Sequence, residues 1–295
     1  MATPIASLLE HYRVTDGRKF RLKKIKPWDT GGLESEIEDE AKNLLADGTK
    51  RLYEQQAKLY AEDRWAVLLI FQALDAAGKD GTIKHVMAGV DPTGSIVTSF
   101  KQPSAEELDH DFLWRCARAL PERGRIGIFN RSYYEETLIV RVHPEILARQ
   151  QLPSRLVTKD IWKERFEDIR NFELHLSRNG VLILKFFLHL SKKEQKKRFL
   201  SRLDEKEKNW KFSLADAEER TYWKQYQAAY EDAIRNTAAA HAPWYVVPAD
   251  NKWFTRLVVA EAIADGMAKL KCDFPRLDAA KTRELAKVRA ALLRE

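Results

Sequence analysis

Several common sequence features are missing from this 295-residue chain, and each absence excludes a class of protein. No apolar run approaches the roughly 18 residues that a membrane-spanning helix needs. The first residues do not place a basic segment before an apolar one, so we expect no signal peptide and a cytoplasmic location. Two cysteines occur, Cys116 and Cys272, without CxxC spacing, and this scarcity fits a reducing compartment. The seven histidines show no HExxH-like spacing, so a structural zinc site is not expected.

Positive charge is what the chain has in excess. It carries 51 Lys and Arg residues against 44 Asp and Glu residues, a formal net charge of +7. The excess is concentrated between Lys192 and Lys211, a segment with nine basic and four acidic residues. A basic surface can bind nucleic acid, an acidic membrane or another polyanion, and charge alone does not choose among them.

The most informative stretch is WAVLLIFQALDAAGKDGTIKHVM, residues 65–87. An apolar, β-branched segment is followed by a loop of small residues, a Gly-Lys pair and an amphipathic helix pattern, which is the order found in a P-loop. We expect Lys79 to reach the terminal phosphates and the free N–H groups at the helix start to bind phosphate oxygens. The alternative is an ordinary strand-to-helix turn with a solvated Lys79. A buried strand that runs directly into Gly-Lys and a helix disfavours it.

This loop departs from the usual G-x-x-x-x-G-K-[ST] pattern at both ends. Ala73 replaces the first glycine, and Asp80 replaces the Ser or Thr that normally contacts Mg²⁺. Asp75 lies inside the loop, where a carboxylate would repel phosphates unless a cation lay between them. Asp75 is therefore the first candidate for holding Mg²⁺ or for orienting a phosphate through it. The other residues expected to contact phosphate here are Ala76, Ala77, Gly78, Asp80, Gly81 and Thr82.

Alternating strand and helix signals predict an α/β fold. Helical segments between the strands imply right-handed crossovers in one parallel, five-stranded sheet with helices on both faces. The predicted strands are residues 67–71, 95–101, 126–129, 181–188 and 244–247. No internal repeat or linker divides the chain, so we expect one domain over residues 1–295, with an N-terminal extension over 1–62.

The segments outside the sheet are less clearly marked. Residues 1–32 carry turn signals and indicate irregular structure. A long helix is expected over residues 34–62, with an Asp-Gly pair at 47–48 that can break it. A capping box predicts a helix over about 104–120. The charged tail after Pro275 is expected to dock loosely or to project. Further helices are expected over 159–178, 191–203 and 251–270.

Polar residues follow the predicted strands at the ends where ligands bind in such sheets. Asn130 and Arg131 stand where P-loop enzymes usually place a metal-binding aspartate. Asparagine supplies no charge, but its oxygen can hold a metal-bound water, and Arg131 can grip a phosphate with two hydrogen bonds. The alternative is a polar strand end with Arg131 in a structural salt bridge. Lys101 and Lys84 are weaker candidates for phosphate contacts, because most surface lysines are only solvated.

The basic segment after the fourth predicted strand indicates a mobile lid over about 191–220. Arg198 and Arg202 are four residues apart and share one helix face, and Lys208 and Lys211 follow that helix. A closing basic lid would neutralise phosphates and exclude water, whereas the ordinary interpretation of such a run is a solvated helix face. Aromatic residues between 210 and 226 are expected to pack in the core rather than stack on a base.

Together, these motifs resemble polyphosphate kinase 2. The likeness is carried by LDAAGKDGTI, SFKQPSAEELDHDFLWR, IFNRSYYEE, LKFFLHLSKKEQKKR, WKF and APWYVVPADNKW, in this order within residues 12–274. The resemblance implies a thymidylate-kinase-like P-loop fold with a helical lid, and Mg²⁺-dependent phosphoryl transfer between inorganic polyphosphate and AMP, ADP or ATP. It places Asp75 and Lys79 in the Walker A loop, Asn130 and Arg131 in the Walker B segment, and Arg198 and Arg202 in the lid helix.

One position departs from the common pattern of this family. Asn130 stands where the family often has aspartate, which is similar to the class III subgroup that phosphorylates both AMP and ADP. One metal-binding carboxylate is then missing. Glu135, Glu136 and Glu145 follow closely, and one of them is expected to help order the metal or the nucleotide. The sequence does not distinguish among them, although we place Glu135 and Glu145 with Asn130 in the nucleotide site.

Two other classes of function stay open at this point. One is an ordinary nucleoside or nucleotide kinase that uses ATP, with the basic segment as its lid. The other is a non-enzymatic protein that binds polyanions, although a mere binder would not need a complete phosphate loop. No histidine lies at a motif position, so direct in-line transfer is expected rather than a phosphohistidine intermediate. The expected partners are polyphosphate, adenine nucleotides with guanine nucleotides as further acceptors, and second copies in a homo-oligomer, but not nucleic acid or membranes.

Overall fold

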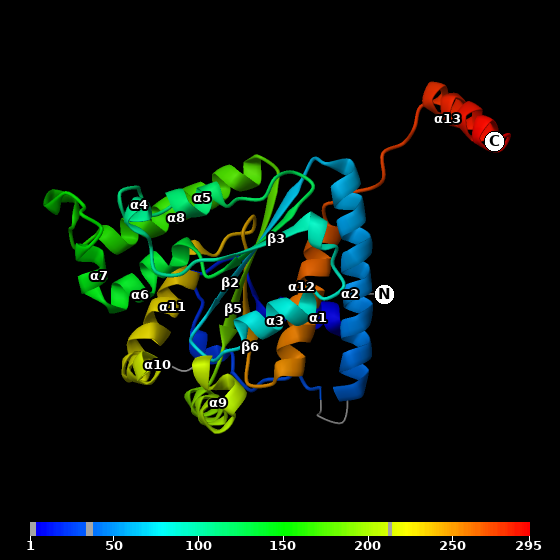
Figure 1. Cartoon of the computed structure of the whole chain (residues 1–295). Helices are drawn as coiled ribbons and strands as arrows, with labels where there is room; N and C mark the ends of the chain where they lie inside the picture. The colour runs from blue at the N-terminus through cyan, green and yellow to red at the C-terminus, as the bar shows by residue number, and fades with distance from the viewer. Residues whose placement is uncertain (1–3, 34–37, 212–213) are drawn as a thin grey trace.

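A central sheet organises the structure (Figure 1). The computed structural model describes residues 4–33, 38–211 and 214–295, and within these ranges the sheet has six strands. The strands are β1 Arg13–Val14, β2 Ala66–Ala73, β3 Ser95–Ser99, β4 Ile126–Asn130, β5 Val181–His189 and β6 Trp244–Pro248. Their order is β1-β6-β5-β2-β4-β3, and neighbours run parallel except for β1 and β6. The predicted α/β fold is confirmed, and β2 lies inside the sheet between β5 and β4.

The central strands are apolar along most of their length because both faces of the sheet are covered. Every residue of β2 is buried, and so are seven of the nine residues of β5. A parallel strand in this position packs with both of its sides, so its sequence does not alternate. The register pairs Phe71 with Asn130 and Ala73 with Leu188. The carboxyl ends of β2, β4 and β5 therefore meet at one edge of the sheet.

The predicted number of strands was wrong, because β1 adds a sixth strand that is antiparallel. Arg13 pairs with Tyr245 and Val14 pairs with Trp244. Residues 1–32 are also more regular than expected, since they include α1 Pro4–Tyr12 and the 3₁₀ helix η1 Leu22–Lys24. A strand of two residues has no side-chain period to recognise, so sequence patterns cannot reveal it.

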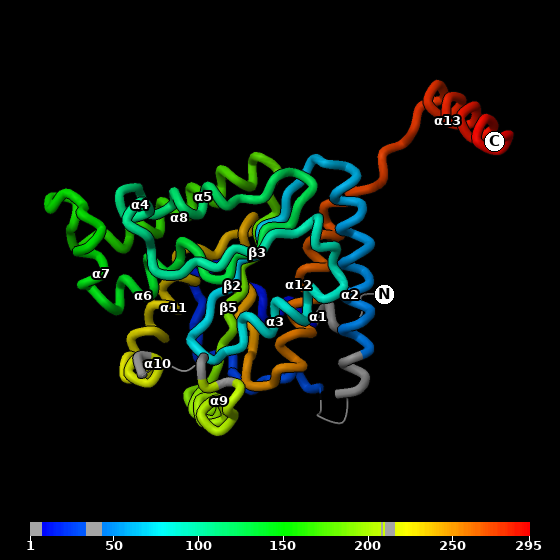
Figure 2. Tube along the Cα trace, viewed as in Figure 1, coloured from blue at the N-terminus to red at the C-terminus, as the bar shows by residue number. Residues whose placement is uncertain are grey.

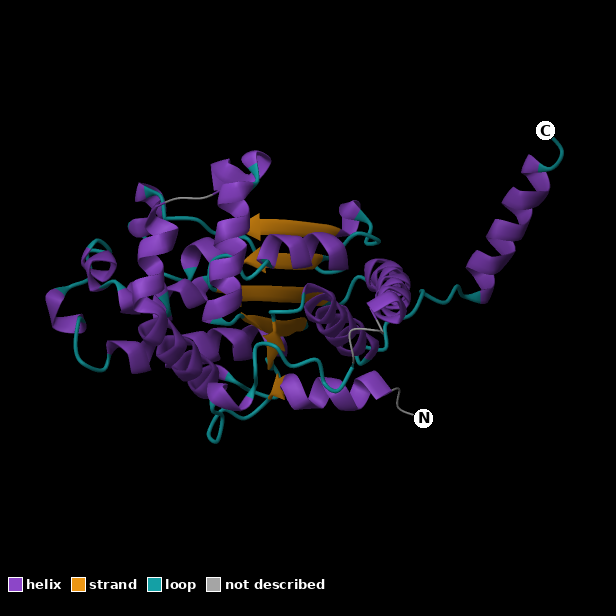
Figure 3. Cartoon of the chain, turned by 90° about the horizontal axis from the view of Figure 1, so that it is seen from below, coloured by secondary structure: helices purple, strands orange, loops and turns teal. Residues whose placement is uncertain are grey.

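On one face of the sheet, α12 packs against β5 and β6, and α2 packs along α12 (Figures 1 and 3). This layer consists of α1, α2 Glu38–Glu62, α3 Lys79–Val86 and α12 Lys252–Ala268. Because α12 is enclosed between the sheet and α2, it is apolar on nearly all sides. The Asp-Gly pair at 47–48 does not interrupt α2, and residues 34–37 of the predicted helix lie outside the described part of the chain.

On the other face, α8 Ile161–Arg178 packs against β5 and α11 Trp223–Thr237 packs against α8. Shorter elements surround them: α4 Ala105–Leu108, α5 Trp114–Arg118, α6 Ile139–Val142, α7 Pro144–Ala148, η4 Tyr133–Thr137 and η5 Ser154–Leu156. The 3₁₀ helix η3 Pro92–Gly94 lies instead beside α2, where the Gln56 side chain donates to the Asp91 carbonyl and accepts from the Asp91 N–H, both at 2.8 Å. The capping box at Ser104 is present, but the helix predicted over 104–120 is split between α4 and α5. Asp111 accepts the Leu113 N–H at 2.9 Å, and this local turn competes with a continuous helix.

The basic segment lies at the carboxyl edge of the sheet, at the bottom of Figure 1. It comprises α9 Lys192–Asp204, η6 Lys206–Lys211, α10 Leu214–Glu219 and η7 Arg220–Tyr222. At the other end of the molecule, α13 Ala279–Leu292 projects from the body, and each of its residues is exposed (Figure 2). Among the described helices, none combines the length and apolar character needed to cross a bilayer.

A buried ion pair between Lys185 of β5 and Glu173 of α8 joins the sheet to this helix. Lys185, in the middle of β5, is fully buried and donates to Glu173 Oε2 at 2.6 Å and to the Thr237 carbonyl at 2.8 Å. Glu173 Oε1 accepts from the hydroxyls of Tyr133 and Tyr134 at 3.0 and 2.8 Å. These tyrosines begin η4, so the pair anchors the segment that directly follows Arg131.

Candidate active site

The phosphate loop, residues 74–78, joins the end of β2 to the start of α3. Two of its residues have left-handed backbone angles, Ala76 with φ 62° and Gly78 with φ 96°. Glycine adopts this region freely, but at Ala76 it costs about 1–2 kcal/mol, so surrounding contacts must hold the loop. Gly78 is the N-cap of α3 and makes no side-chain capping bond. The N–H groups at the start of α3 are therefore available to an anion.

Lys79 lies at the base of this loop. Its Nζ donates to the Ala73 carbonyl at 2.9 Å. Burial lowers the pKa of Lys79 and the nearby Arg131 lowers it further, while the carboxylates of Asp75 and Glu135 oppose the shift. Two cations are thus held close together, which favours an anionic ligand between them.

Asn130 at the end of β4 and Arg131 after it lie across the site from the phosphate loop. Arg131 has a left-handed backbone with φ 66°, and its Nη2 lies 3.3 Å from Asp75 Oδ1. Burial acts to lower the pKa of Arg131, but the carboxylates of Glu135 and Asp75 outweigh it and the pKa is raised. Burial raises the pKa of Glu135, and Arg131 and Lys79 limit the rise. Asn130 Nδ2 donates to Asp80 Oδ1 at 2.6 Å, so Asp80 is bound to the strand end.

An open groove of about 920 Å³ runs past the phosphate loop. Its walls include the loop, the start of α3, Ser99 and Phe100 at the end of β3, and residues of α9 and α12. Seven basic residues line it: Lys79, Lys101, Arg131, Arg198, Arg202, Lys252 and Arg256. Three acidic residues line it as well: Asp75, Asp80 and Asp216. The excess of cations makes this groove suited to an extended polyanion.

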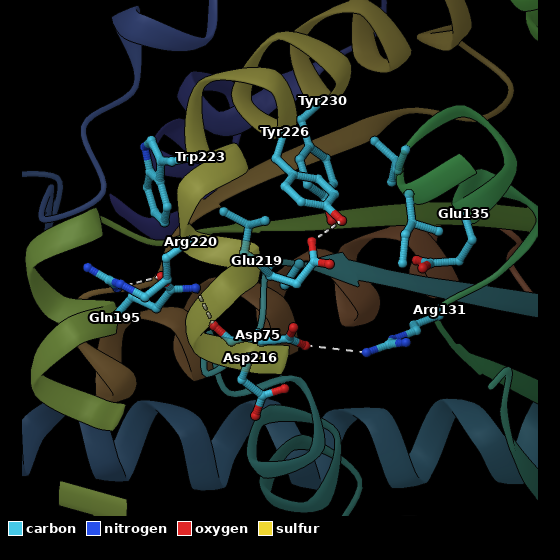
Figure 4. A pocket seen from close by; sticks show the side chains of 14 residues that line it. Asp75, Arg131, Glu135, Gln195, Asp216, Glu219, Arg220, Trp223, Tyr226 and Tyr230 are labelled. Atoms are coloured by element: carbon cyan, nitrogen blue, oxygen red, sulfur yellow. Dashed lines mark hydrogen bonds and ion pairs between the residues drawn. The ribbon is translucent and has the colours of Figure 1, made fainter. Parts of the chain in front are cut away.

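A second, narrow cavity of about 50 Å³ is also lined by Asp75 and Arg131 (Figure 4). Tyr226 and Tyr230 of α11 point into it side by side, and Glu219 accepts from the Tyr226 hydroxyl at 2.7 Å. Four residues line both this cavity and the groove: Leu74, Asp75, Arg131 and Asp216. The two spaces therefore meet at the Asp75–Arg131 pair.

The structure brings most of the predicted site residues together. Ala76, Ala77, Gly78, Asp80, Gly81, Thr82, Lys101 and Arg202 all line the groove, and Glu135 lines the narrow cavity. Lys84 is exposed on α3 and lines neither space. Glu145 is exposed on α7, where its Oε1 lies 3.2 Å from His143 Nδ1, away from both spaces. The side chains of Lys208 and Lys211 lie outside the described part of the structure.

The structure distinguishes the three glutamates that follow Asn130, because each has different neighbours. Glu135 faces Arg131 and Lys79, whereas Glu136 is buried and lies 2.7 Å from Arg165 Nη1. Glu136 is thus a structural residue, and Glu135 is the one at the site.

Sequence reasoning missed Lys252 and Arg256, which are four residues apart in the first turns of α12. The signal was available, because α12 follows β6 and the end of β6 lies at the same edge as the phosphate loop. The cavity-lining role of Trp223 and Tyr226 was also missed, since core packing was the expectation for these aromatics.

The acidic and amide oxygens at the groove fit a magnesium ion. Among the described residues, no group of three or more His, Cys, Asp or Glu side chains could hold a metal alone. Mg²⁺ usually takes one or two protein carboxylates and completes its shell with water and substrate phosphates. Asp75, Asp80 and Asn130 line the groove beside the phosphate loop and offer such a partial set.

Comparison with known proteins identifies the family. Residues 35–275 match the family model for polyphosphate kinase 2. The chain belongs to the polyphosphate kinase 2 family. Its relatives in that family include the ADP-polyphosphate phosphotransferase of Rhodopseudomonas palustris, which is 53% identical over 97% of this chain and 98% of its own length. The AMP/ADP-polyphosphate phosphotransferase of Meiothermus ruber is 42% identical over 92% of this chain and 97% of its own length.

The fold agrees with a solved structure of the same family. The crystal structure of polyphosphate kinase 2 from Arthrobacter aurescens TC1 matches with a TM-score of 0.85 and 39% identity over 97% of both chains. The P-loop kinase fold predicted for this chain is therefore confirmed, with the sixth strand as the difference.

Proposed function

We propose that this protein transfers phosphoryl groups from inorganic polyphosphate to AMP and to ADP, in a reversible reaction that requires Mg²⁺. The observation that carries the proposal is that a basic groove and an aromatic cavity meet at Asp75 and Arg131. Phosphoryl transfer needs a donor and an acceptor aligned at one point, with positive charge around the transferred group. The names of two close relatives, which refer to ADP and to AMP/ADP, support these acceptors.

The groove is the proposed site of the polyphosphate chain. Polyphosphate carries negative charge on every phosphate, so it requires a row of cations rather than one pocket. Lys101 and Arg202 line this groove on either side of the phosphate loop, and Lys252 and Arg256 extend the row along α12. An ordinary kinase that binds only the three phosphates of ATP would not need so long a basic surface.

The narrow cavity is the proposed site of the acceptor nucleotide. Trp223 and Tyr226 offer aromatic surface for a base, and Arg131 and Glu135 stand where the acceptor phosphate would enter. A volume of about 50 Å³ admits water but not a nucleotide, so binding requires the cavity to open. The wall formed by Glu219 and Arg220 at the end of the basic segment is the part that we expect to move.

The residues of this chain would act mainly by position and charge. Arg131 would hold the acceptor phosphate in line with the donor chain, and Lys79 would stabilise charge on the transferred group. When bound, Mg²⁺ would neutralise phosphate charge, with Asp75, Asp80 and Asn130 as its protein ligands. Glu135 would keep Arg131 oriented between the two spaces. We place no histidine in the reaction and propose direct in-line transfer.

The test is incubation of the purified protein with polyphosphate, Mg²⁺ and either AMP, ADP or GDP, with the products separated by chromatography. We expect ADP and ATP from AMP, and ATP from ADP, and Lys79→Ala should lower both rates by about two to three orders of magnitude. Lys163→Ala, which removes an exposed lysine from α8, is the matched control and should retain activity. Turnover that requires ATP as donor would show an ordinary nucleotide kinase. Salt-dependent binding that is indifferent to Lys79 and yields no product would show a polyanion-binding protein.

A further inference from the structure

Arg198 of α9 lies in the wall of the groove but directs its whole guanidinium group at protein oxygens. Its Nε donates to Glu194 Oε1 at 2.9 Å. Its Nη1 donates to the carbonyls of Ala76 and Ala77 at 3.1 and 3.0 Å, and its Nη2 donates to the two carbonyls of residues 249–250 at 2.7 and 3.0 Å. A guanidinium has five N–H groups, and these five bonds use all of them. The side chain is 10% exposed, so it is held among these partners.

Gln195, on the same face of α9, extends this contact by one residue of the phosphate loop. Its Nε2 donates to the Asp75 carbonyl at 2.9 Å, and its side chain is buried. Three consecutive carbonyls, those of residues 75–77, therefore point at α9. In a trans peptide the C=O and the following N–H point in opposite directions, and the described chain contains no cis peptide. The N–H groups that follow these carbonyls are thus turned away from α9, and that of Ala77 donates within the loop to the Leu74 carbonyl at 3.2 Å.

The same contacts explain how the loop keeps its shape. Ala76 has φ 62°, a conformation that a residue with a Cβ keeps only when its surroundings determine it. Arg198 binds the carbonyl of Ala76 itself and the next one along, so it acts on the strained residue directly. Arg202, one turn later on α9, differs because its guanidinium lies over the Phe199 ring, 5.6 Å from the ring centre, and lines the groove.

We propose that Arg198, assisted by Gln195, is a positioning residue that fixes the carbonyl side of the phosphate loop and so orients the N–H groups that receive phosphate. Arg198 does not contact the transferred phosphate, and Arg202 is the arginine of α9 that binds polyphosphate. The first two turns of α9 then belong to the fixed floor of the site, and any closing movement begins after Arg198. The kinetic part of this proposal rests on the proposed phosphotransferase function, but the structural part does not.

The structural part is tested by amide hydrogen exchange of residues 74–82 in the ligand-free protein. Arg198→Lys keeps the charge but offers three N–H groups from one point, which cannot reach the loop and residues 249–250 together. We expect exchange in residues 74–82 to rise at least about tenfold, the factor for one lost hydrogen bond to a charged group. Arg202→Lys is the matched control and should leave exchange there unchanged. Unchanged exchange in Arg198→Lys would overturn the proposal.

The kinetic part separates positioning from phosphate binding. Arg198→Lys should lower kcat about 100-fold, as expected for a displaced catalytic loop, with the apparent KM for polyphosphate and its salt dependence near those of the wild type. Arg202→Ala should instead raise that KM and weaken its salt dependence. Near-normal kcat in Arg198→Lys would show that charge alone is required and would overturn the proposal. If the wild type lacks polyphosphate activity, the proposed function fails and hydrogen exchange still decides the role of Arg198.

A second-site variant gives an independent check. Ala76→Gly removes the cost of the left-handed conformation, so the loop should depend less on Arg198. Arg198→Lys should then lower kcat by a smaller factor in the Ala76→Gly background than in the wild type. An equal factor in both backgrounds would contradict the link between Arg198 and loop shape. If Arg198→Lys does not fold, Gln195→Ala, which removes one bond to the loop, should show smaller changes in the same direction.

Discussion

Replacing Lys185 by methionine should destabilise the protein strongly, because it leaves a buried carboxylate without its cation. All three N–H groups of Lys185 have partners: Glu173 Oε2 at 2.6 Å, the Thr237 carbonyl at 2.8 Å and the Tyr134 hydroxyl at 3.0 Å. Both members of the pair are almost fully buried, with side-chain exposures of 0% and 1%. Burial lowers the pKa of Lys185, and its pairing with Glu173 opposes that shift. Lys185 therefore stays charged because of Glu173 and the two other hydrogen-bond acceptors around it.

The expected cost of Lys185→Met is about 3–5 kcal/mol, the usual penalty for breaking a buried pair by removing one member. Methionine fills a similar volume without branching, so little of the loss should come from packing. The measurement is urea denaturation followed by circular dichroism, with the free energy of unfolding extrapolated to water. Because Tyr133 and Tyr134 hydrogen-bond to Glu173 and follow Arg131, the variant should also lose activity under conditions in which it is still folded.

A double substitution tests the reasoning. Lys185→Met with Glu173→Gln removes both charges but keeps acceptors for the tyrosine hydroxyls, so it should be more stable than Lys185→Met alone. A loss of less than about 1 kcal/mol in the free energy of unfolding of Lys185→Met would refute the reasoning, because an unpaired buried carboxylate should destabilise the protein by more than that. Equal stability of the single and double variants would show that the two charges are not coupled.

Three further outcomes are expected. Lys79→Ala should lower kcat by about two to three orders of magnitude while circular dichroism stays unchanged, and near-normal turnover would remove the phosphate-loop assignment. Asp75→Asn should lose more activity and need more Mg²⁺ than Asp80→Asn, because Asp75 lines both spaces and contacts Arg131; the reverse order in a Mg²⁺ titration would show that the wrong carboxylate was chosen. Burial lowers the pKa of His189 from 6.5 to about 4, so the unfolded chain binds the proton more readily. Stability should be complete above pH 6.5 and fall by about 3 kcal/mol as the pH drops to about 4, and denaturation of His189→Gln should lack this slope.

The parts of the fold that the sequence predicted are those with a strong local pattern. Residues 67–71 form a continuous apolar run, residues 181–188 form one that only Lys185 interrupts, and both are strands. The phosphate loop was recognisable because few other functions require small residues and a Gly-Lys pair between a strand and a helix. Asn130 and Arg131 followed from the rule that ligands bind beyond strand ends, and the structure brings Arg131 within 3.3 Å of Asp75.

The parts that were missed depend on contacts between distant segments. The pairing of β1 with β6 places Arg13 opposite Tyr245, and no sequence pattern near Arg13 predicts this pairing. Lys185 interrupts an apolar strand, and only the structure shows that Glu173 of α8 neutralises it. The role proposed for Arg198 also needed coordinates, because sequence spacing gives the helix face but not the atoms at which the guanidinium is directed.

The pairing of the first strand with the last has a consequence for synthesis of the protein. Arg13 leaves the ribosome early, but its partner Tyr245 appears more than 200 residues later. Until β6 is made, β1 has no strand to pair with, and the edge of β5 that will pair with β6 has unpaired backbone groups. Such long-range pairing is slow, and an unpaired strand edge invites association with other chains. The sheet of the nascent chain therefore keeps an unpaired edge, at which it can associate with other chains, until its last strand is made.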